Sequence, residues 1–343
     1  MTTEEQRPPS KTPGLREVAA LAGVSMGTVS NVLNRPDTVQ AKNRRSVEEA
    51  IAQLNFVGSH AAVQLRSGRS QLIGVVLPDV GNPFWGNVLR GVESVTDEAG
   101  VFLVVSSTRQ EAERESSALA SFLSRNVDGL LLAPVAGENK FLDAYLARNV
   151  HVVTFERRLG RGDVPTVYGN NVAGGDVAAE HLLALGHRRI VLVNGPVFIS
   201  WSHDRRLGVE HALRRNGLDP SDALIEVVVP DLTAEYGEKA VVRVLELIPD
   251  SGAILCGNDL VALGVLRGLI ASDRRVPENY SLVGYDDVDF AAALSPALTT
   301  MRQPSFDMGA TAARMLLDPE YSREDVAFAA QLVVRGSTAP PVH

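Results

Sequence analysis

The sequence predicts a small all-α N-terminal domain followed by a larger α/β domain of two lobes. Residues 12–58 read as short helices, whereas from Leu72 onward short β-branched apolar runs alternate with amphipathic stretches of about 12–16 residues. Residues 1–70 hold nine Lys and Arg against six Asp and Glu, and the remaining chain holds 24 against 35. A basic domain attached to an acidic one favours a polyanionic partner, although chance variation in charge explains the difference equally well.

The remaining segments set the domain boundaries. Residues 1–11 are polar with two prolines, so we expect a disordered tail and no signal peptide there. Residues 59–70 read as a linker, and the second domain is expected over 71–338. The single cysteine, Cys256, excludes an internal disulfide, and no apolar stretch approaches the roughly 18 residues of a membrane span. We therefore expect a cytoplasmic protein.

The sequence lacks the motifs of common enzyme classes. It has no P-loop, no Gly-x-Gly-x-x-Gly after a strand, no Gly-x-Ser-x-Gly elbow and no His-Glu-x-x-His. Its seven histidines do not cluster at metal-ligand spacings. We therefore expect no enzyme, no catalytic residue, no cofactor and no metal.

Residues 15–33 carry the most specific signal, a helix-turn-helix. Gly23 supplies the positive φ of the turn, and Ser25 can cap the second helix. An inward face at i, i+3, i+4 spacing is formed by Val29, Val32 and Leu33. The outward face is polar with little charge and comprises Met26, Gly27, Thr28, Ser30 and Asn31. Such a face suits a helix that lies in the DNA major groove, and an ordinary helical hairpin is the alternative.

A third helix is expected over Ala41–Leu54, and its inward face is formed by Val47, Ile51 and Leu54. Lys42, Arg44 and Arg45 at its start can contact DNA phosphates. The alternative is that these three are solvated surface charges.

The second domain reads as a doubly wound α/β fold. Its strands are almost continuously apolar, as expected when both faces of a sheet are covered. They are expected at Leu72–Leu77, Val101–Ser106, Gly129–Leu132, His151–Phe155, Ile190–Asn194, Ile225–Val229, Ala253–Cys256, Ser281–Gly284 and Gln331–Val334. About 270 residues exceed one comfortable sheet, so we expect two similar lobes with a cleft between them.

Motifs placed in order along nearly the whole chain resemble those of one family. They are Val18-Ala19…Ala22-Gly23-Val24-Ser25…Thr28-Val29-Ser30…Val32-Leu33-Asn34, Leu54-Asn55-Phe56, Ala62-Val63-Gln64-Leu65, Ile73-Gly74-Val75…Asn82-Pro83-Phe84-Trp85, His181-Leu182-Leu183…Leu185-Gly186-His187-Arg188-Arg189-Ile190, Asn258-Asp259…Ala262-Leu263-Gly264, Val283-Gly284-Tyr285-Asp286-Asp287 and Leu298-Thr299-Thr300…Arg302-Gln303-Pro304. With these motifs the chain resembles the LacI/GalR family of bacterial repressors.

The resemblance implies a headpiece on a body like the periplasmic sugar-binding proteins, with three chain crossings between lobes. Lobe 1 would span about 71–169 and 301–329, and lobe 2 about 170–300 and 330–338. A homodimer would bind a near-palindromic operator, and a hinge helix over roughly 59–66 would order on DNA and insert Leu65 into the minor groove. The implied DNA contacts are Ser25, Met26, Gly27, Thr28, Ser30, Asn31, Asn34, Lys42, Arg44, Arg45, Ala62 and Leu65. Packing of Leu65 on the body is the alternative.

This chain departs from the family pattern at several positions. Gly14 stands where a hydroxyl usually caps the first helix, and Gln40 stands where Ser often caps the third. Asn31 replaces a frequent Arg, which favours a bidentate pair with adenine or a single phosphate contact. Glu156-Arg157 and Asn170-Asn171 stand where Asp-Arg and Asp-Asn are common.

The resemblance also implies a ligand site between the lobes. Arg205 corresponds to a ligand-clamping arginine, Asp286 and Asn258 to polar contacts, and Asn170 joins them. Aromatic rings that can stack on a sugar are expected from Phe84, Trp85, Phe155 and Trp201. The alternatives are core packing for the rings and a structural ion pair for Arg205 and Asp286. Asp259 is expected to cap a helix beside the site.

These expectations lead to a repressor whose operator affinity is set by a small sugar-like effector. Two competing hypotheses are a solute-binding protein of a transporter, which shares the body, and an enzyme on a two-lobed α/β body. The effector shifts the dimer between states only if it binds them with different affinity.

Overall fold

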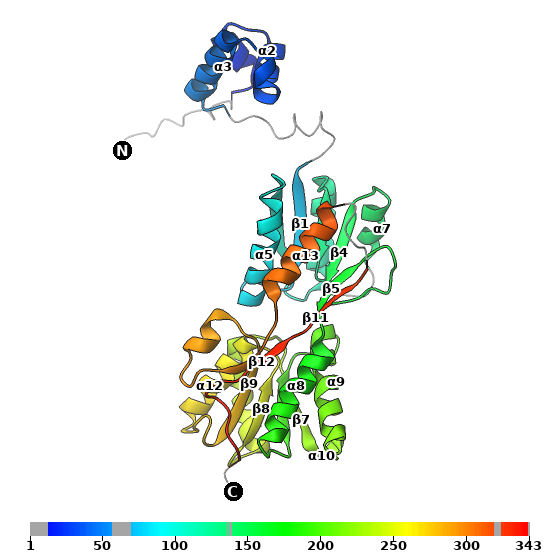
Figure 1. The fold of residues 1–343 in the computed structure, drawn as a ribbon, viewed down its shortest axis with the longest axis vertical. Coiled ribbons are helices and arrows are strands. Elements are labelled where there is room, and N and C mark those ends of the chain that lie inside the picture. Colours follow the sequence, from blue (N-terminus) through cyan, green and yellow to red (C-terminus); the bar gives the residue numbers. More distant parts are fainter. Residues whose placement is uncertain (1–12, 57–69, 136, 138, 319–323, 342–343) are drawn as a thin grey trace, which may run out of the picture. The chain divides into compact units, whose positions relative to one another are not determined.

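The computed structural model describes residues 13–56, 70–135, 137, 139–318 and 324–341 (Figure 1). The chain divides into two compact units, Met1–Ser70 and Gln71–His343. The expected N-terminal tail and the expected hinge helix, with Ala62 and Leu65, lie outside the described residues.

The first unit is a three-helix headpiece. Its helices are α1 (Leu15–Ala22), α2 (Met26–Asn34) and α3 (Ala41–Leu54), with the short 3₁₀ helix η1 (Pro36–Thr38) before α3. Helices α1 and α3 pack on α2 around a buried core of Val18, Ala19, Val29, Val32, Val47, Ala50 and Phe56. The expected helix-turn-helix is therefore present at the expected residues.

The ends of the headpiece helices follow from local chemistry. Gly23 ends α1 with a φ of 65°, and Ser25 Oγ accepts the Thr28 N–H at 3.1 Å to cap α2. Gly14 has no side chain to cap α1, but the Glu17 carboxylate accepts the Gly14 N–H at 2.9 Å. The expectation that Leu33 faces inward is wrong, because the other two helices cover only the side of α2 that carries Val29 and Val32 and leave Leu33 42% exposed.

The second unit contains two six-stranded sheets, each covered by helices on both faces (Figure 1). The elements of the first lobe are β1 (Leu72–Leu77), α5 (Pro83–Thr96), β2 (Phe102–Ser107), α6 (Ala112–Ser124), β3 (Gly129–Leu132), α7 (Lys140–Leu146), β4 (His151–Phe155), β5 (Thr166–Gly169), α13 (Ser305–Leu317) and β11 (Val326–Phe328). Its strand order is β11-β5-β4-β3-β1-β2, and all its pairings are parallel. Helices α5 and α13 bury one face, and α6 and α7 bury the other.

The second lobe repeats this plan. Its elements are α8 (Asn171–Ala184), β6 (Ile190–Asn194), α9 (Ser200–Arg215), α10 (Pro220–Ala223), β7 (Leu224–Val228), α11 (Ala234–Leu247), β8 (Gly252–Cys256), α12 (Asp259–Ala271), β9 (Tyr280–Asp286), η2 (Asp289–Ala293), β10 (Thr299–Arg302) and β12 (Gln331–Val333). The strand order is β12-β10-β9-β8-β6-β7, and only the β10–β12 pairing is antiparallel among the described strands. Helices α11 and α12 cover one face, and α8 and α9 cover the other.

The chain passes between the two sheets three times: from β5 to α8, from β10 to α13 and from β11 to β12. Each expected strand is present, with its ends within two residues of the expected ones. Strand β10 belongs wholly to the second sheet, so the expected lobe boundary after residue 300 falls inside a strand. Among the described residues, no helix is long and apolar enough to cross a membrane.

Candidate functional site

Helix α2 presents the face that the sequence assigns to DNA. Met26 is 51% exposed, Gly27 and Asn31 are also exposed, and Thr28 and Ser30 are half-buried. The Ser25 and Thr28 hydroxyls lie 3.0 Å apart, so each already has a local partner. This face therefore offers Asn31 as its least committed polar side chain, between apolar Met26 and backbone at Gly27.

The basic side chains at the start of α3 are also accessible. Lys42 and Arg45 are exposed, and Arg44 lies 3.8 Å from Glu48 one turn later. Such exposed i, i+4 pairs are weak, so Arg44 remains available to a phosphate.

A pocket opens at the carboxyl ends of both sheets in the second unit. It holds about 540 Å³ of empty space, including its open mouth. Its lining residues are Pro78, Asp79, Asn82, Phe84, Trp85, Gln110, Glu156, Ile199, Trp201, Arg205, Asp231, Leu232, Asn258, Asp286 and Gln303. Crevices at the carboxyl ends of parallel strands are the usual ligand sites of open α/β sheets.

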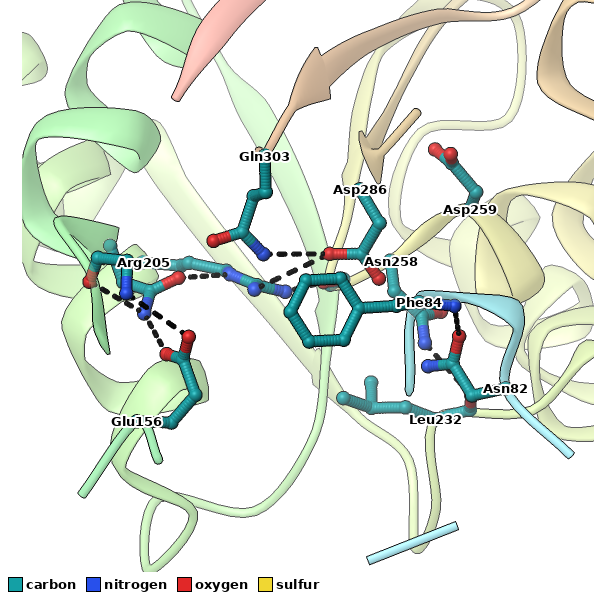
Figure 2. Close-up of polar contacts among 12 residues, drawn as sticks. Asn82, Phe84, Glu156, Arg205, Leu232, Asn258, Asp259, Asp286 and Gln303 are labelled. Atoms are coloured by element: carbon teal, nitrogen blue, oxygen red, sulfur yellow. Dashed lines mark hydrogen bonds and ion pairs between the residues drawn. The ribbon is translucent and has the colours of Figure 1, made fainter. Parts of the chain in front are cut away.

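Arg205 lies at the centre of the polar side of this pocket (Figure 2). It projects from α9 and is only 5% exposed. Its Nε donates to Asn171 Oδ1 at 2.9 Å, one terminal nitrogen donates to the Gly257 carbonyl, and the guanidinium stacks 3.6 Å from the centre of the Tyr285 ring. The guanidinium plane is therefore fixed before any ligand binds.

Asp286 faces the same guanidinium from the end of β9. Its Oδ1 lies 3.7 Å from the Arg205 terminal nitrogen and accepts Gln303 Nε2 at 3.0 Å (Figure 2). Burial raises the pKa of Asp286 to about 6, although Arg205 and Gln303 both counteract this rise. Its φ of 108° is rare outside glycine, and such strained backbone clusters at functional sites.

Glu156 lies on the other side of Arg205, at the end of β4. Its carboxylate accepts the Gly169 N–H at 3.1 Å and Asn171 Nδ2 at 2.6 Å, so it ties β4 to the first crossing between lobes (Figure 2). Burial raises the pKa of Glu156 to about 7, against the lowering effect of Arg205. Asn171 connects Glu156 to Arg205 because its amide contacts both.

The cap of α12 is a correction to the sequence prediction. Asn258 is the N-cap, and its Oδ1 accepts the Val261 N–H at 2.8 Å. Asp259 instead accepts the Val288 N–H at 2.9 Å and the Thr300 hydroxyl at 2.6 Å. It therefore joins β10 to the loop after β9, and burial raises its pKa to about 8.

The aromatic residues divide into two groups. Phe84, Trp85 and Trp201 line the pocket, and the two tryptophan rings meet edge to face with centres 6.4 Å apart across the lobes. Phe155 is fully buried in the core of the first lobe, 6.1 Å from Trp85, and does not line the pocket.

Of the eight residues expected to bind an effector, six line this pocket: Phe84, Trp85, Trp201, Arg205, Asn258 and Asp286. Asn170 does not, because it is exposed and its side chain caps α8 by accepting the Ala173 N–H at 3.1 Å. The lining residues that we did not assign to the site include Gln303, Asp79 and Asp231. Their sequence signal is weak, because each simply follows a strand at its carboxyl end.

Comparisons with known proteins agree with this architecture. Residues 14–59 match the family "Bacterial regulatory proteins, lacI family", and residues 179–338 match "Periplasmic binding protein-like domain". The ribose operon repressor of Escherichia coli K12 is 31% identical over 94% of this chain and 99% of its own length. The HTH-type transcriptional regulator CelR of Thermobifida fusca is 34% identical over 89% of this chain and 91% of its own length.

Solved structures extend the likeness to the fold. The Lac repressor dimer bound to operator and the anti-inducer ONPF matches with a TM-score of 0.80 and 30% identity over 96% of this chain and all of that chain. The CelR–cellobiose complex matches with a TM-score of 0.70 and 31% identity over 95% of this chain and 99% of that one. A LacI-family regulator from Enterococcus faecium with bound ribose matches with a TM-score of 0.71 and 29% identity over 78% of this chain and 99% of that one. The chain therefore belongs to the LacI family of bacterial regulatory proteins, and it is a DNA-binding transcription regulator.

Proposed function

We propose that this chain is a repressor that binds a near-palindromic operator as a homodimer, and that a sugar or sugar-like effector in the pocket sets its operator affinity. The observation that carries the proposal is the buried Arg205–Asp286 pair facing aromatic rings within one pocket between two lobes. Planar, bidentate polar groups opposite an aromatic wall are what a polyhydroxylated ring requires.

The polar groups of this pocket retain capacity for a ligand. The Asp286 Oδ2 oxygen accepts no hydrogen bond from the described residues, and the second Arg205 terminal nitrogen makes only the 3.7 Å contact with Asp286. Asn82 uses its Oδ1 to cap α5 by accepting the Phe84 N–H at 3.0 Å, which leaves its amide hydrogens for a ligand. An acceptor next to a double donor suits vicinal hydroxyl groups.

The relatives support the effector class and the assembly. One is named a ribose operon repressor, and solved structures of similar regulators contain ribose or cellobiose. The Lac repressor structure is a dimer on operator DNA. The family resemblance further implies that Leu65 would enter the minor groove from a hinge helix, and that the repressor would act on the nucleoid in the cytoplasm.

A solute-binding protein of a transporter is the alternative function, because it would share the two-lobed body. The lacI-family match over residues 14–59 and the exposed face of α2 favour the repressor. A solute receptor of a transporter does not need a helix-turn-helix domain.

DNA binding is tested with the full chain, a duplex from upstream of its own gene and a random duplex of equal length. We expect specific binding that weakens on the order of 10³-fold between 50 and 200 mM salt, because roughly six phosphates would be neutralised per dimer. Failure to discriminate the two duplexes at either salt concentration would exclude the repressor.

Effector binding is tested by calorimetry with ribose and cellobiose. Arg205→Ala and Asp286→Ala are each expected to weaken binding at least about tenfold, because each removes a charged hydrogen-bond partner. Arg215→Ala is the matched control, since Arg215 lies on the same helix, is exposed and pairs with Asp176. Unchanged affinity in the first two variants would contradict the proposed site.

A further inference from the structure

The charge of the pocket restricts its ligand further. We infer that it takes an uncharged polyhydroxylated ligand and excludes the phosphorylated and carboxylated forms of the same sugar. This inference rests on the proposed function of the pocket. The lining of the pocket includes four carboxyl groups, those of Asp79, Glu156, Asp231 and Asp286, whereas Arg205 is the single cation among the lining residues.

The single cation keeps only one terminal nitrogen for a ligand. Two of the three Arg205 nitrogens donate to Asn171 and to the Gly257 carbonyl, and the third lies 3.7 Å from Asp286. Tyr285 covers one face of the guanidinium. A guanidinium binds a phosphate or carboxylate most strongly when it turns two parallel N–H donors to the anion. An anion at Arg205 would instead lie against the carboxylate of Asp286.

Two further carboxylates stand at the mouth, one from each lobe. Asp79 follows β1, and its Oδ1 accepts the Gly81 N–H at 2.8 Å. Asp231 follows β7, and its Oδ1 accepts the Leu232 N–H at 2.8 Å. Neither has an ion-pair partner within the part of the chain that the structure describes. Closing the lobes on an anionic ligand would therefore add a third negative charge between them.

The helix ends at the pocket do not reverse this balance. Helices α5, α9 and α12 begin there, and each N-terminus carries about half an elementary positive charge. The side-chain oxygens of Asn82 and Asn258 already accept first-turn N–H groups of α5 and α12. The three fractional charges are thus smaller in sum than the negative charge of the lining.

Burial of the inner carboxyl groups reduces their negative charge but does not remove it, so Asp79 and Asp231 carry most of the effect. Glu156 and Asp286 have raised pKa values because they have lost water. A ligand phosphate would penalise their ionised forms again, whereas a neutral hydroxyl group donates to Asp286 at no such cost. The site is therefore complementary to hydroxyl groups and opposed to anions.

The charge is measured first with quenching ions, which need no knowledge of the effector. The chain has two tryptophans, Trp85 and Trp201, and both line the pocket. Trp85 is 4% exposed, so ionic quenching of the full-length protein reports Trp201. We expect caesium to quench at least about threefold more strongly than iodide, after each is normalised to N-acetyltryptophanamide. Equal quenching by the two ions would overturn the inference.

Matched variants separate the pocket from the overall negative charge. Asp79→Asn with Asp231→Asn is expected to bring the two quenching constants together. Asp250→Asn with Asp273→Asn removes the same charge from exposed loops at the opposite ends of the second-lobe strands, and it should leave the difference intact. If both double variants reduce the difference equally, the asymmetry belongs to the whole surface and the inference fails.

Matched ligands then test the class directly. Calorimetry compares ribose with ribose 5-phosphate, and glucose with glucose 6-phosphate and glucuronate. For any sugar that binds, we expect its anionic form to bind at least about tenfold more weakly. An anionic form that binds as tightly overturns the charge inference but leaves the proposed sugar site standing. Ionic asymmetry without binding of any sugar, free or anionic, supports the charge of the pocket and contradicts the proposed function.

Discussion

Two buried carboxyl groups line the pocket and a third directly follows the lining residue Asn258, and the environments of all three link stability to pH. Glu156, Asp259 and Asp286 have pKa values raised by burial to about 7, 8 and 6. A carboxyl group with a raised folded-state pKa binds its proton more tightly in the folded chain than in the unfolded one. Its contribution to stability is therefore complete below the unfolded pKa and is lost as pH rises through the folded pKa.

Glu156→Gln tests this linkage at one residue. Between pH 5.5 and 8 the unmodified chain should lose about 2 kcal/mol of unfolding free energy that the variant does not lose, because the folded pKa of Glu156 is about 7 against an ordinary 4.5. The measurement is the dependence of the unfolding free energy on pH, taken from urea unfolding. The amide also disturbs the contact with Asn171, but it does so at every pH and therefore does not change this dependence. Glu98→Gln, at an exposed residue, is the control and should keep the original slope. Parallel slopes for all three chains would contradict the assignment.

A substitution at Asn31 tests whether α2 contacts the DNA bases. It is exposed, so Asn31→Ala should leave the headpiece folded while it removes a bidentate pair with adenine. Binding to an operator selected from random duplexes should fall about 10- to 100-fold, and one A·T pair should lose its effect on affinity. Gln53→Ala, exposed on α3, should change neither quantity. An equal loss across all single-base operator variants would indicate a phosphate contact instead.

For single residues, the sequence predicted those that line the pocket better than the buried residues that hold them in place. Arg205, Asp286 and Trp85 match positions of the family, Trp201 was expected from its place after a strand, and the structure brings all four to one pocket. The role of Asp259 was not predictable, because its partners lie 29 and 41 residues away. Long-range hydrogen bonds of this kind leave no local trace in a sequence.

Among the elements, three helix pairs share one packing device. A Cβ atom added to Gly91 of α5 would overlap the Phe306 carbonyl of α13 and lie 2.9 Å from Ala310 N. The pairs α8–α9 and α11–α12 have equivalent glycines, at Gly208 and Gly264. Backbones that approach this closely place both helices of each pair against the sheet.

Two substitutions on the same helix isolate this effect. Gly91→Ala should lower the unfolding free energy by about 1–3 kcal/mol or more, because α5 and α13 must separate. Gly86→Ala is the matched control: its Cβ meets nothing within 4 Å, so helix propensity should stabilise the chain by about 0.5–1 kcal/mol. Thermal and urea unfolding measure both. Equal effects of the two substitutions would mean that the close contact between α5 and α13 does not contribute to the unfolding free energy.

The long strands were predictable from the sequence, whereas three short strands were not. Long β-branched runs such as β1 and β6 were predictable, because both faces of a central parallel strand are buried. Strands β5, β10 and β11 were not predicted. They are three or four residues long, and β10 contains two buried threonines, Thr299 and Thr300. The Thr300 hydroxyl donates to Asp259, and Thr299 Oγ1 accepts the Arg335 N–H. Residues far away in the sequence therefore satisfy the two buried hydroxyl groups, which the local sequence does not indicate.

For the whole molecule, the relation between lobes determines what a ligand can transmit. The second-lobe residues Val288 and Phe290 pack into the first-lobe core, while Trp85 meets Trp201 across the pocket. The chain crosses between the lobes three times, and Glu156 and Gln303 make hydrogen bonds beside two of these crossings. An effector between the lobes therefore selects among a small set of lobe arrangements, and it changes operator affinity only through unequal binding to them.

Coupling between the effector pocket and operator binding must be reciprocal. If an effector changes the operator dissociation constant of the full chain by some factor, saturating operator must change the effector dissociation constant by the same factor, expected at about 5- to 150-fold. Anisotropy of labelled operator measures the first quantity, and the fluorescence of Trp85 and Trp201 measures the second. Arg205→Ala should abolish the effector response while operator binding without effector persists, because Arg205 lies in the second unit and not in the headpiece. A ligand that changes the tryptophan signal but leaves operator affinity constant would show that the pocket binds without regulating, and the repressor would then need its signal from another site.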